Sequence, residues 1–176
     1  MGLPDLFTDR LKMRMPQSSD VEQIYRLGSS PEVMRYISFG RPQTYAEARS
    51  DLRRRIRQSA NGLGYWITER RDSGDFVGWM ALKQMDDTTE IEIGYRFVEE
   101  QWNQGFATEA GRRLLRYGFE EKELQQIVAV ALAENKASLR VMEKIGLRYD
   151  HTGIYYDTEC VLYKITRGDW VRRNKR

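Results

Sequence analysis

The sequence predicts one α/β domain in which helices cover both faces of a mixed, mostly antiparallel sheet of about seven strands. The chain has 176 residues, a length that suits a domain with its own hydrophobic core, and we expect residues 1–176 to form it. Strand-like and helix-like segments alternate along the chain without a linker, repeat or low-complexity stretch. This order is typical of a three-layer α/β/α arrangement.

The first third of the chain predicts a strand followed by three helices. Residues 7–15 alternate partly between apolar and polar side chains, as in a half-buried strand. A Ser-Asp pair can cap a helix over 19–27, and a proline suits the first turn of a short helix over 31–36. A threonine and a glutamate with capping-box spacing open a longer helix over 44–58.

The middle of the chain predicts three strands joined by tight turns. The strands are expected over 65–70, 76–83 and 91–98. The connecting segments 72–75 and 86–89 consist of Asp, Ser, Thr and Gly residues, which favour turns. Connections this short predict antiparallel pairing of consecutive strands.

The last third predicts two helices and three strands. Small or apolar residues recur at helical spacing over 108–121. The continuous apolar run 127–132 suits a strand that is buried on both faces. A helix over 136–145 ends at a glycine, and the segments 148–156 and 159–166 are expected to form a closing antiparallel pair.

The composition excludes several classes of protein. No apolar run approaches the ~20 residues that span a membrane, and the N-terminus lacks the pattern of a secretory signal. Cys160 is the only cysteine, which excludes an internal disulfide and predicts a reducing, cytoplasmic location. One cysteine and one histidine are too few for a typical zinc site, so we expect no metal.

The connection between the strand 91–98 and the helix 108–121 predicts an anion site. A glycine-containing turn before a helix exposes main-chain N–H groups, and the helix N-terminus adds roughly half a positive charge. Two residues of the turn, a glycine and an alanine, have almost no side chain, so a phosphate can approach the backbone closely. We expect a pyrophosphate to be bound by the N–H groups of Gln104, Gly105, Phe106, Ala107 and Thr108.

Three motifs carry a family resemblance. They are, in chain order, Thr8-Asp9-Arg10-Leu11-x-x-Arg14, then Ile93-Gly94-Tyr95 followed by Trp102 to Ala110, and last Asn135 to Leu147. Together they resemble the GNAT family of acyl-coenzyme A N-acyltransferases, and most closely its RimJ/RimL branch, which includes N-terminal acetyltransferases of ribosomal proteins. The resemblance covers nearly the whole chain and implies a GNAT-like fold with acetyl-CoA as co-substrate.

Two residues depart from the family pattern. Asn103 stands where the family favours glycine, although asparagine tolerates a left-handed backbone better than most residues. Met142 stands where the broad family often has a tyrosine that protonates the leaving thiolate. Methionine cannot do this, so either another group serves or the thiolate leaves unassisted.

The resemblance also implies which residues contact the coenzyme. Main-chain N–H groups between Gly94 and Phe97 are expected to bind the thioester oxygen, and the expected contacts include Tyr95 and Val98. The Asn135 amide is expected to bond the pantetheine arm. The alternative for Asn135 is that it only caps the helix that follows it.

Candidate catalytic residues come from three places. Glu92 is the first candidate base because in a straight strand it lies on one face with Gly94, whereas an ordinary polar-face glutamate is the alternative. The Ser138 hydroxyl donates to the coenzyme sulfur or the departing thiolate, or else bonds nearby backbone. The final hairpin supplies further candidates, with turn solvation or packing as the alternative for each: Tyr155, Tyr156, Asp157 and Glu159.

We therefore expect an acetyl-CoA-dependent N-acetyltransferase that acts by direct transfer in a ternary complex. The acceptor is an amine, either the N-terminus of a ribosomal or other protein or a small amine. A homodimer is a further expectation, while membrane and direct nucleic-acid partners are not expected. Two alternatives stay open: a catalytically silent acyl-CoA-binding sensor, and a ribosome- or RNA-associated module that uses the arginines of 53–57.

Overall fold

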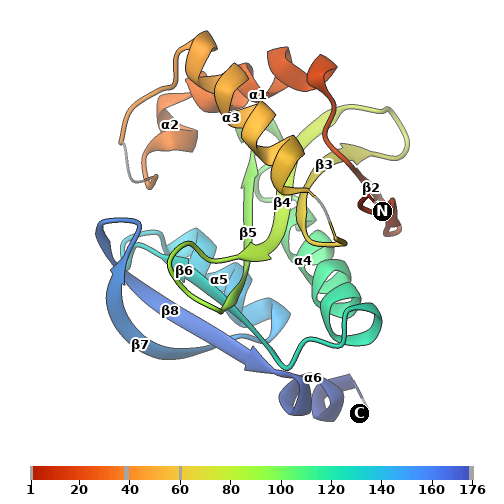
Figure 1. Cartoon of the computed structure of the whole chain (residues 1–176), viewed down its shortest axis with the longest axis vertical. Coiled ribbons are helices and arrows are strands. Elements are labelled where there is room, and N and C mark those ends of the chain that lie inside the picture. The colour runs from red at the N-terminus through yellow and green to blue at the C-terminus, as the bar shows by residue number, and fades with distance from the viewer. Residues whose placement is uncertain (1, 38–39, 60, 175–176) are drawn as a thin grey trace.

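The computed structural model describes residues 2–37, 40–59 and 61–174, which form the fold in Figure 1. The elements are, in chain order, β1 (Leu6–Phe7), β2 (Leu11–Arg14), α1 (Val21–Ser29), α2 (Pro31–Met34), α3 (Tyr45–Gln58), β3 (Gly64–Arg70), β4 (Phe76–Gln84), β5 (Ile91–Phe97), α4 (Phe106–Arg116), β6 (Gln126–Ala131), α5 (Lys136–Ile145), β7 (Arg148–Tyr155), β8 (Thr158–Thr166) and α6 (Arg167–Asn174). Short helical turns occupy Ser18–Asp20, Glu99–Gln101 and Tyr117–Glu121.

The strands form an eight-stranded sheet in the order β1-β2-β3-β4-β5-β6-β8-β7. Neighbouring strands are antiparallel except β5 and β6, which are parallel and pair at one position, Glu92 opposite Val128. The predicted α/β fold with a mixed, mostly antiparallel sheet is confirmed. The sheet has one strand more than expected because the predicted first strand, 7–15, is interrupted by a turn in which the Thr8 N–H donates to the Leu11 carbonyl at 2.9 Å.

Helices cover the two faces of the sheet because alternate residues of each strand point to opposite sides. In β3 and β4, Trp66 and Met80 pack in a core with α4, whereas Ile67 and Trp79 pack against α1 and α3. Figure 1 shows α1, α2 and α3 grouped at one end of the molecule and α6 at the other end. Within the described ranges, no helix is both long enough and apolar enough to cross a membrane.

Helix boundaries follow local capping signals. In α3, the Thr44 hydroxyl accepts from the Glu47 N–H at 3.3 Å and the Glu47 carboxylate accepts from the Thr44 N–H at 2.8 Å, as the capping box predicts. Gly146 ends α5 with a φ of 110°. The sequence analysis missed α6, although a threonine three residues before an aspartate marks its start. Thr166 Oγ1 donates to Asp169 Oδ2 at 2.7 Å and accepts from the Asp169 N–H at 3.2 Å.

Candidate active site

A cleft of about 680 Å³ opens beside the single pairing between β5 and β6. Beyond that position the two strands form no further pairs, which leaves room between them for a ligand. The α4–α5 half of the cleft is lined by Gly94, Tyr95, Ala107, Asn135, Ser138 and Met142. The α3 half is lined by charged and aromatic side chains that include Asp51, Arg55, Trp79, Glu92, Arg96 and Tyr156.

The turn before α4 has the conformation needed to expose main-chain N–H groups. Gly105 precedes the helix with a φ of 81° and Asn103 has a φ of 58°, so both adopt a left-handed backbone. Among the described residues, no side chain caps the N-terminus of α4, so its first N–H groups have no side-chain partner. Ala107 lines the cleft, whereas Gln104 and Gly105 are exposed. This geometry suits a bound anion.

Glu109, in the first turn of α4, ties this turn to the N-terminal motif. Its carboxylate accepts from Thr8 Oγ1 at 2.6 Å, from Arg10 Nε at 2.6 Å and from the Arg10 main-chain N–H at 3.0 Å. Arg10 Nη1 also donates to the Gln104 carbonyl at 3.0 Å. Burial raises the pKa of Glu109, but the hydrogen bonds from Thr8 and Arg10 outweigh this and hold the pKa below its ordinary value. The sequence analysis noted the motif without this positioning role.

Six of the ten predicted coenzyme contacts are absent from the residues that line the cleft, namely Phe97, Val98, Gln104, Gly105, Phe106 and Thr108. Phe97 and Val98 are each 4% exposed and Phe106 is 2% exposed, and all three pack in the core. The Phe97 carbonyl accepts from Trp102 Nε1 at 2.8 Å. Thr108 is half-buried in the first turn of α4. Any coenzyme contact from this group is therefore expected from the main chain, and these predictions remain to be tested.

The start of α5 brings polar groups to the cleft. Asn135 Oδ1 accepts from the Ser138 N–H at 3.2 Å and caps the helix, while its amide NH₂ group is left for other contacts. Burial raises the pKa of Tyr95, and a hydrogen bond with the Ser138 hydroxyl opposes this. Met142 is 4% exposed and forms an apolar part of the same wall. Two hydroxyl groups thus lie together where Met142 supplies no proton donor.

Glu92 lies at the point where β5 and β6 meet, and it is 9% exposed. Its Oε2 accepts a short hydrogen bond from the Tyr156 hydroxyl and lies 3.3 Å from Lys83 Nζ, which also donates to the Tyr156 hydroxyl at 2.9 Å. Burial, followed by the charge and hydrogen bond of Glu92, raises the pKa of Tyr156, so this hydroxyl stays protonated at neutral pH. The result is a carboxylate held inside the cleft by two donors.

The β7–β8 turn decides which hairpin residue reaches Glu92. Tyr156 and Asp157 form the turn with φ values of 52° and 60°. Tyr155 and Asp157 also line the cleft, but the Tyr155 hydroxyl lies 2.7 Å from Nε2 of His151, and Asp157 is exposed. Glu159 is exposed on β8. Adjacent tyrosines cannot be told apart in the sequence, because hairpin register determines which face each one occupies.

Comparisons with known proteins identify the family. Residues 10–148 match the acetyltransferase (GNAT) domain. The uncharacterized protein YkkB of Bacillus subtilis is 34% identical over 90% of this chain and 94% of its own length. The FsC-acetyl coenzyme A-N(2)-transacetylase of Aspergillus fumigatus is 33% identical over 98% of this chain and 80% of its own length. A crystal structure of a GNAT-family acetyltransferase from Bacillus anthracis has a TM-score of 0.82 at 27% identity and covers 94% of this chain and 99% of its own.

The part of the chain that matches the family includes the main elements of the cleft. The matched range includes the strand that carries Glu92, the turn before α4 and the start of α5. The RimJ/RimL branch remains a prediction because these similarities identify the family without separating its branches. The chain therefore belongs to the GNAT acetyltransferase family, and it is an N-acetyltransferase.

Proposed function

We propose that this protein transfers an acetyl group from acetyl-CoA directly to a primary amine within a ternary complex. The observation that carries the proposal is the continuity of the cleft. It reaches from the N-terminal turn of α4 to the carboxylate of Glu92 and the charged side chains of α3. A donor and an acceptor can therefore occupy the two halves of one cavity and meet beside Gly94.

Acetyl-CoA fits the α4–α5 half of the cleft. The uncapped N-terminus of α4 and the left-handed turn at Gly105 offer N–H groups to the pyrophosphate. A Cβ atom at Gly94 would meet no atom within 4 Å, so the backbone of β5 is open to a thioester. The NH₂ group of Asn135 lies at the start of α5, where it can donate to a pantetheine carbonyl.

In the proposed reaction, Glu92 accepts a proton from the amine. An α-amine has a pKa of ~8 and a lysine-type amine a pKa of ~10, so a base is needed at neutral pH. The amine nitrogen then attacks the thioester carbonyl, whose oxygen is stabilised by N–H groups of the β5 segment from Gly94 to Phe97. When the C–S bond breaks, the hydroxyl groups of Tyr95 and Ser138 hydrogen-bond to the departing thiolate, the role that Met142 cannot fill. The nitrogen loses its second proton as the amide forms, and the thiolate gains one to leave as the free thiol of coenzyme A.

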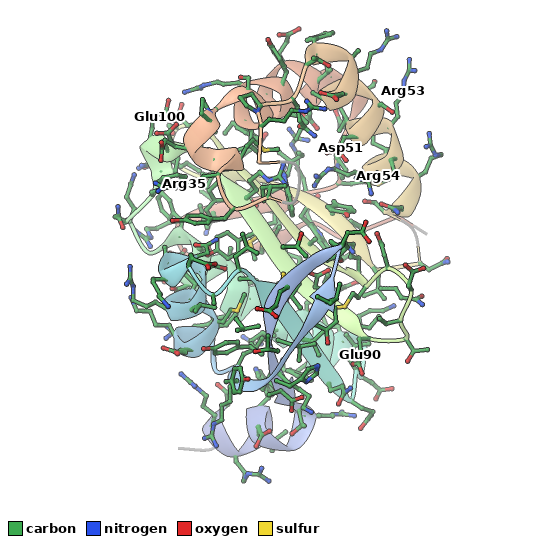
Figure 2. All side chains as sticks on the ribbon, turned by 90° about the vertical axis from the view of Figure 1, so that its left-hand side faces the viewer. Arg35, Asp51, Arg53, Arg54, Glu90 and Glu100 are labelled. Atoms are coloured by element: carbon green, nitrogen blue, oxygen red, sulfur yellow. The ribbon has the colours of Figure 1, made fainter. Side chains whose placement is uncertain are left out.

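A silent acyl-CoA-binding sensor is the second candidate function, and the buried Met142 is the observation that favours it. The RNA-binding alternative has less support. Arg54 pairs with Asp51, and Arg55 is 5% exposed. Figure 2 shows Arg53 on the outer side of α3, away from Asp51. The basic cluster is thus divided between the cleft and the surface and does not form one face for a phosphate backbone.

We further propose a cytoplasmic location, as the single cysteine suggests, and an acceptor that is a small amine or a protein N-terminus, as in the RimJ/RimL branch. A homodimer remains a proposal. No cluster of three or more His, Cys, Asp or Glu side chains suited to a metal occurs among residues 2–37, 40–59 and 61–174. The proposed reaction routes no step through a metal.

Two measurements on the purified protein test the proposed function. Calorimetry with coenzyme A should detect binding at one site per chain. A free-thiol assay with acetyl-CoA and a panel of amines and peptides should show amine-dependent thiol release, with the acetylated amine identified by mass spectrometry. Binding without thiol release would support the sensor, and absence of binding would refute both candidates.

A further inference from the structure

Basic side chains are concentrated in the α3 half of the cleft. They are Arg41, Arg54, Arg55, Lys83 and Arg96. Most have carboxylate partners within the described residues. Arg41 pairs with Glu47 at 2.6 Å, and Arg54 and Arg55 both pair with Asp51. Lys83 lies 3.3 Å from Glu92 and 3.6 Å from Asp86.

Arg96 differs because it forms no ion pair among the described residues. It lies on the same face of β5 as Glu92, directly opposite Trp79 on β4. Within residues 2–37, 40–59 and 61–174, its Nη1 donates only to Met34 Sδ, at 3.4 Å, and its buried Nε has no hydrogen-bond partner. Burial and then the charge of Arg55 lower the pKa of Arg96 to about 9, so it is still charged at neutral pH. The charge of Asp51 partly offsets these effects, but a half-buried cation without a direct ion pair would still gain from a carboxylate that a ligand supplies.

Arg55 provides a second unused donor at the same place. Its Nε donates to Asp51 Oδ2 at 2.8 Å, while its buried Nη1 has no partner among the described residues. Its guanidinium lies 4.1 Å from the ring centre of Trp79 and 4.5 Å from that of Tyr65. The Arg96 guanidinium lies 5.3 Å from the Trp79 ring centre. Both guanidinium groups therefore lie within 5.3 Å of the centre of the same indole, and both residues line the cleft and have a buried N–H group without a partner among the described residues.

We propose that Arg96 and Arg55 bind a carboxylate of the acceptor, so that the substrate is an amine that also carries an acidic group. This inference rests on the proposed acetyl transfer. The planar N–H donors of guanidinium match the two oxygens of a carboxylate. With the amine beside Glu92 and Gly94, the acidic group lies further along β5, toward Arg96.

The same charges disfavour acceptors that carry several positive charges. A polyamine would place a second cation near Arg96, which forms no direct ion pair with any residue that the structure describes. Like charges close together in a partly buried site repel each other more strongly than in water. We therefore expect amines that carry a carboxylate, such as amino acids, to be better acceptors than polyamines or aminoglycosides.

Matched acceptor pairs test the inference by steady-state kinetics. Each pair consists of an amino acid and the amine that remains without its carboxylate, such as lysine with cadaverine, phenylalanine with phenethylamine and β-alanine with ethylamine. We expect kcat/KM to be at least about tenfold higher for the member with the carboxylate in the pairs that are accepted. Equal or lower values would overturn the inference while leaving acetyl transfer intact.

The variant Arg96→Gln tests whether the preference for acceptors with a carboxylate depends on this side chain. It should remove most of the preference for the carboxylate, mainly through KM, and leave the affinity for coenzyme A unchanged. The matched control is Arg116→Gln, because Arg116 is exposed on α4 and pairs with Glu120 away from the cleft. A preference that persists in Arg96→Gln would overturn the assignment.

A binding measurement keeps the inference testable if no amine is acetylated. Nuclear magnetic resonance of ¹⁵N-labelled protein can follow the Arg96 Nε–H signal, identified by its loss in Arg96→Gln. Titration with succinate, against sodium chloride of equal ionic strength, should shift this signal. A shift would support the carboxylate site even if the proposed acetyl transfer fails, and no shift would overturn the inference.

Discussion

The two halves of the cleft are built in different ways. The α4–α5 half depends on main-chain groups and on uncharged side chains such as Tyr95 and Met142, and the turn proposed to bind the pyrophosphate runs through consecutive residues from Asn103 to Ala107. The α3 half depends on charged and aromatic side chains from α3, β4, β5 and the β7–β8 turn, including Asp51, Arg96 and Tyr156. The α4–α5 half can use its backbone to bind a group that is the same in every reaction. In the α3 half, by contrast, a few side-chain substitutions would change which ligand is bound.

This difference separates donor binding from acceptor chemistry. A ligand held by backbone N–H groups tolerates changes of most side chains but not changes of backbone conformation. A ligand held by paired and unpaired charges responds to each substitution of a charged residue. Variants in one half should therefore leave the function of the other half largely intact.

The largest expected effect is the loss of turnover in Glu92→Gln. Removing the proposed base should lower kcat by about a hundredfold or more, while coenzyme affinity stays the same. Steady-state kinetics and calorimetry measure the two quantities separately. Glu90→Gln is the matched control, because Glu90, labelled in Figure 2, immediately precedes β5 and its Oε2 accepts from Gln126 Nε2 at 2.6 Å. Unchanged turnover in Glu92→Gln would remove this residue from the mechanism.

Gly105→Val should be the next most severe change, and it acts on the other half. A β-branched residue at a φ of 81° is strained, so the turn is expected to shift and coenzyme affinity to fall by about tenfold or more. Gly74→Val is the matched control, since Gly74 has a φ of 76° in an exposed turn with no atom within 4 Å of a Cβ. If calorimetry finds the same affinity in both variants, the proposed pyrophosphate turn is wrong.

Ser138→Ala and Tyr95→Phe should each lower kcat by about tenfold, the value of one hydrogen bond to the departing thiolate. The Ser138 main-chain N–H would still be capped by Asn135 in the alanine variant, so helix α5 should keep its start. If these variants slow the departure of the thiolate, their kcat should depend on the pKa of the leaving thiol when acetyl thioesters of different thiols are compared. A dependence no stronger than in the wild type would argue against both hydroxyls as donors.

The smallest expected effect concerns stability. Glu109→Gln should lower the free energy of unfolding by about 1 kcal/mol, because it weakens charge-assisted hydrogen bonds that are partly exposed. The folded-state pKa of Glu109 is lowered, so this contribution is present above its ordinary pKa and is lost as pH falls through the folded value. Urea unfolding at neutral and acidic pH measures it. Glu120→Gln, in an exposed pair with Arg116, should change stability less; an equal change would contradict the anchoring role.

Much of the fold was predictable from local patterns. The capping box at Thr44 and the glycine that ends α5 mark helix boundaries, since both act within one turn of helix. The strands of 65–98 followed from short turns between apolar segments. The interruption of the first strand was missed although its turn is closed locally, since the Thr8 hydroxyl accepts from the Leu11 N–H at 2.9 Å. Only the further bond from the Thr8 hydroxyl to Glu109 joins residues that lie 101 positions apart in the chain.

The candidate site also has one part that the local sequence predicts and one part that it does not. The sequence alone determined the turn before α4, since a glycine between a strand and a helix specifies its backbone locally, and it placed Glu92 on the face of β5 opposite Ile93 and Phe97. Only the tertiary structure decided that Tyr156 and Lys83 bond Glu92 and that Arg96 forms no ion pair within the described part of the chain. The physical reason is that side-chain pairing depends on strand register and on the packing of α3, and both join residues far apart in the chain.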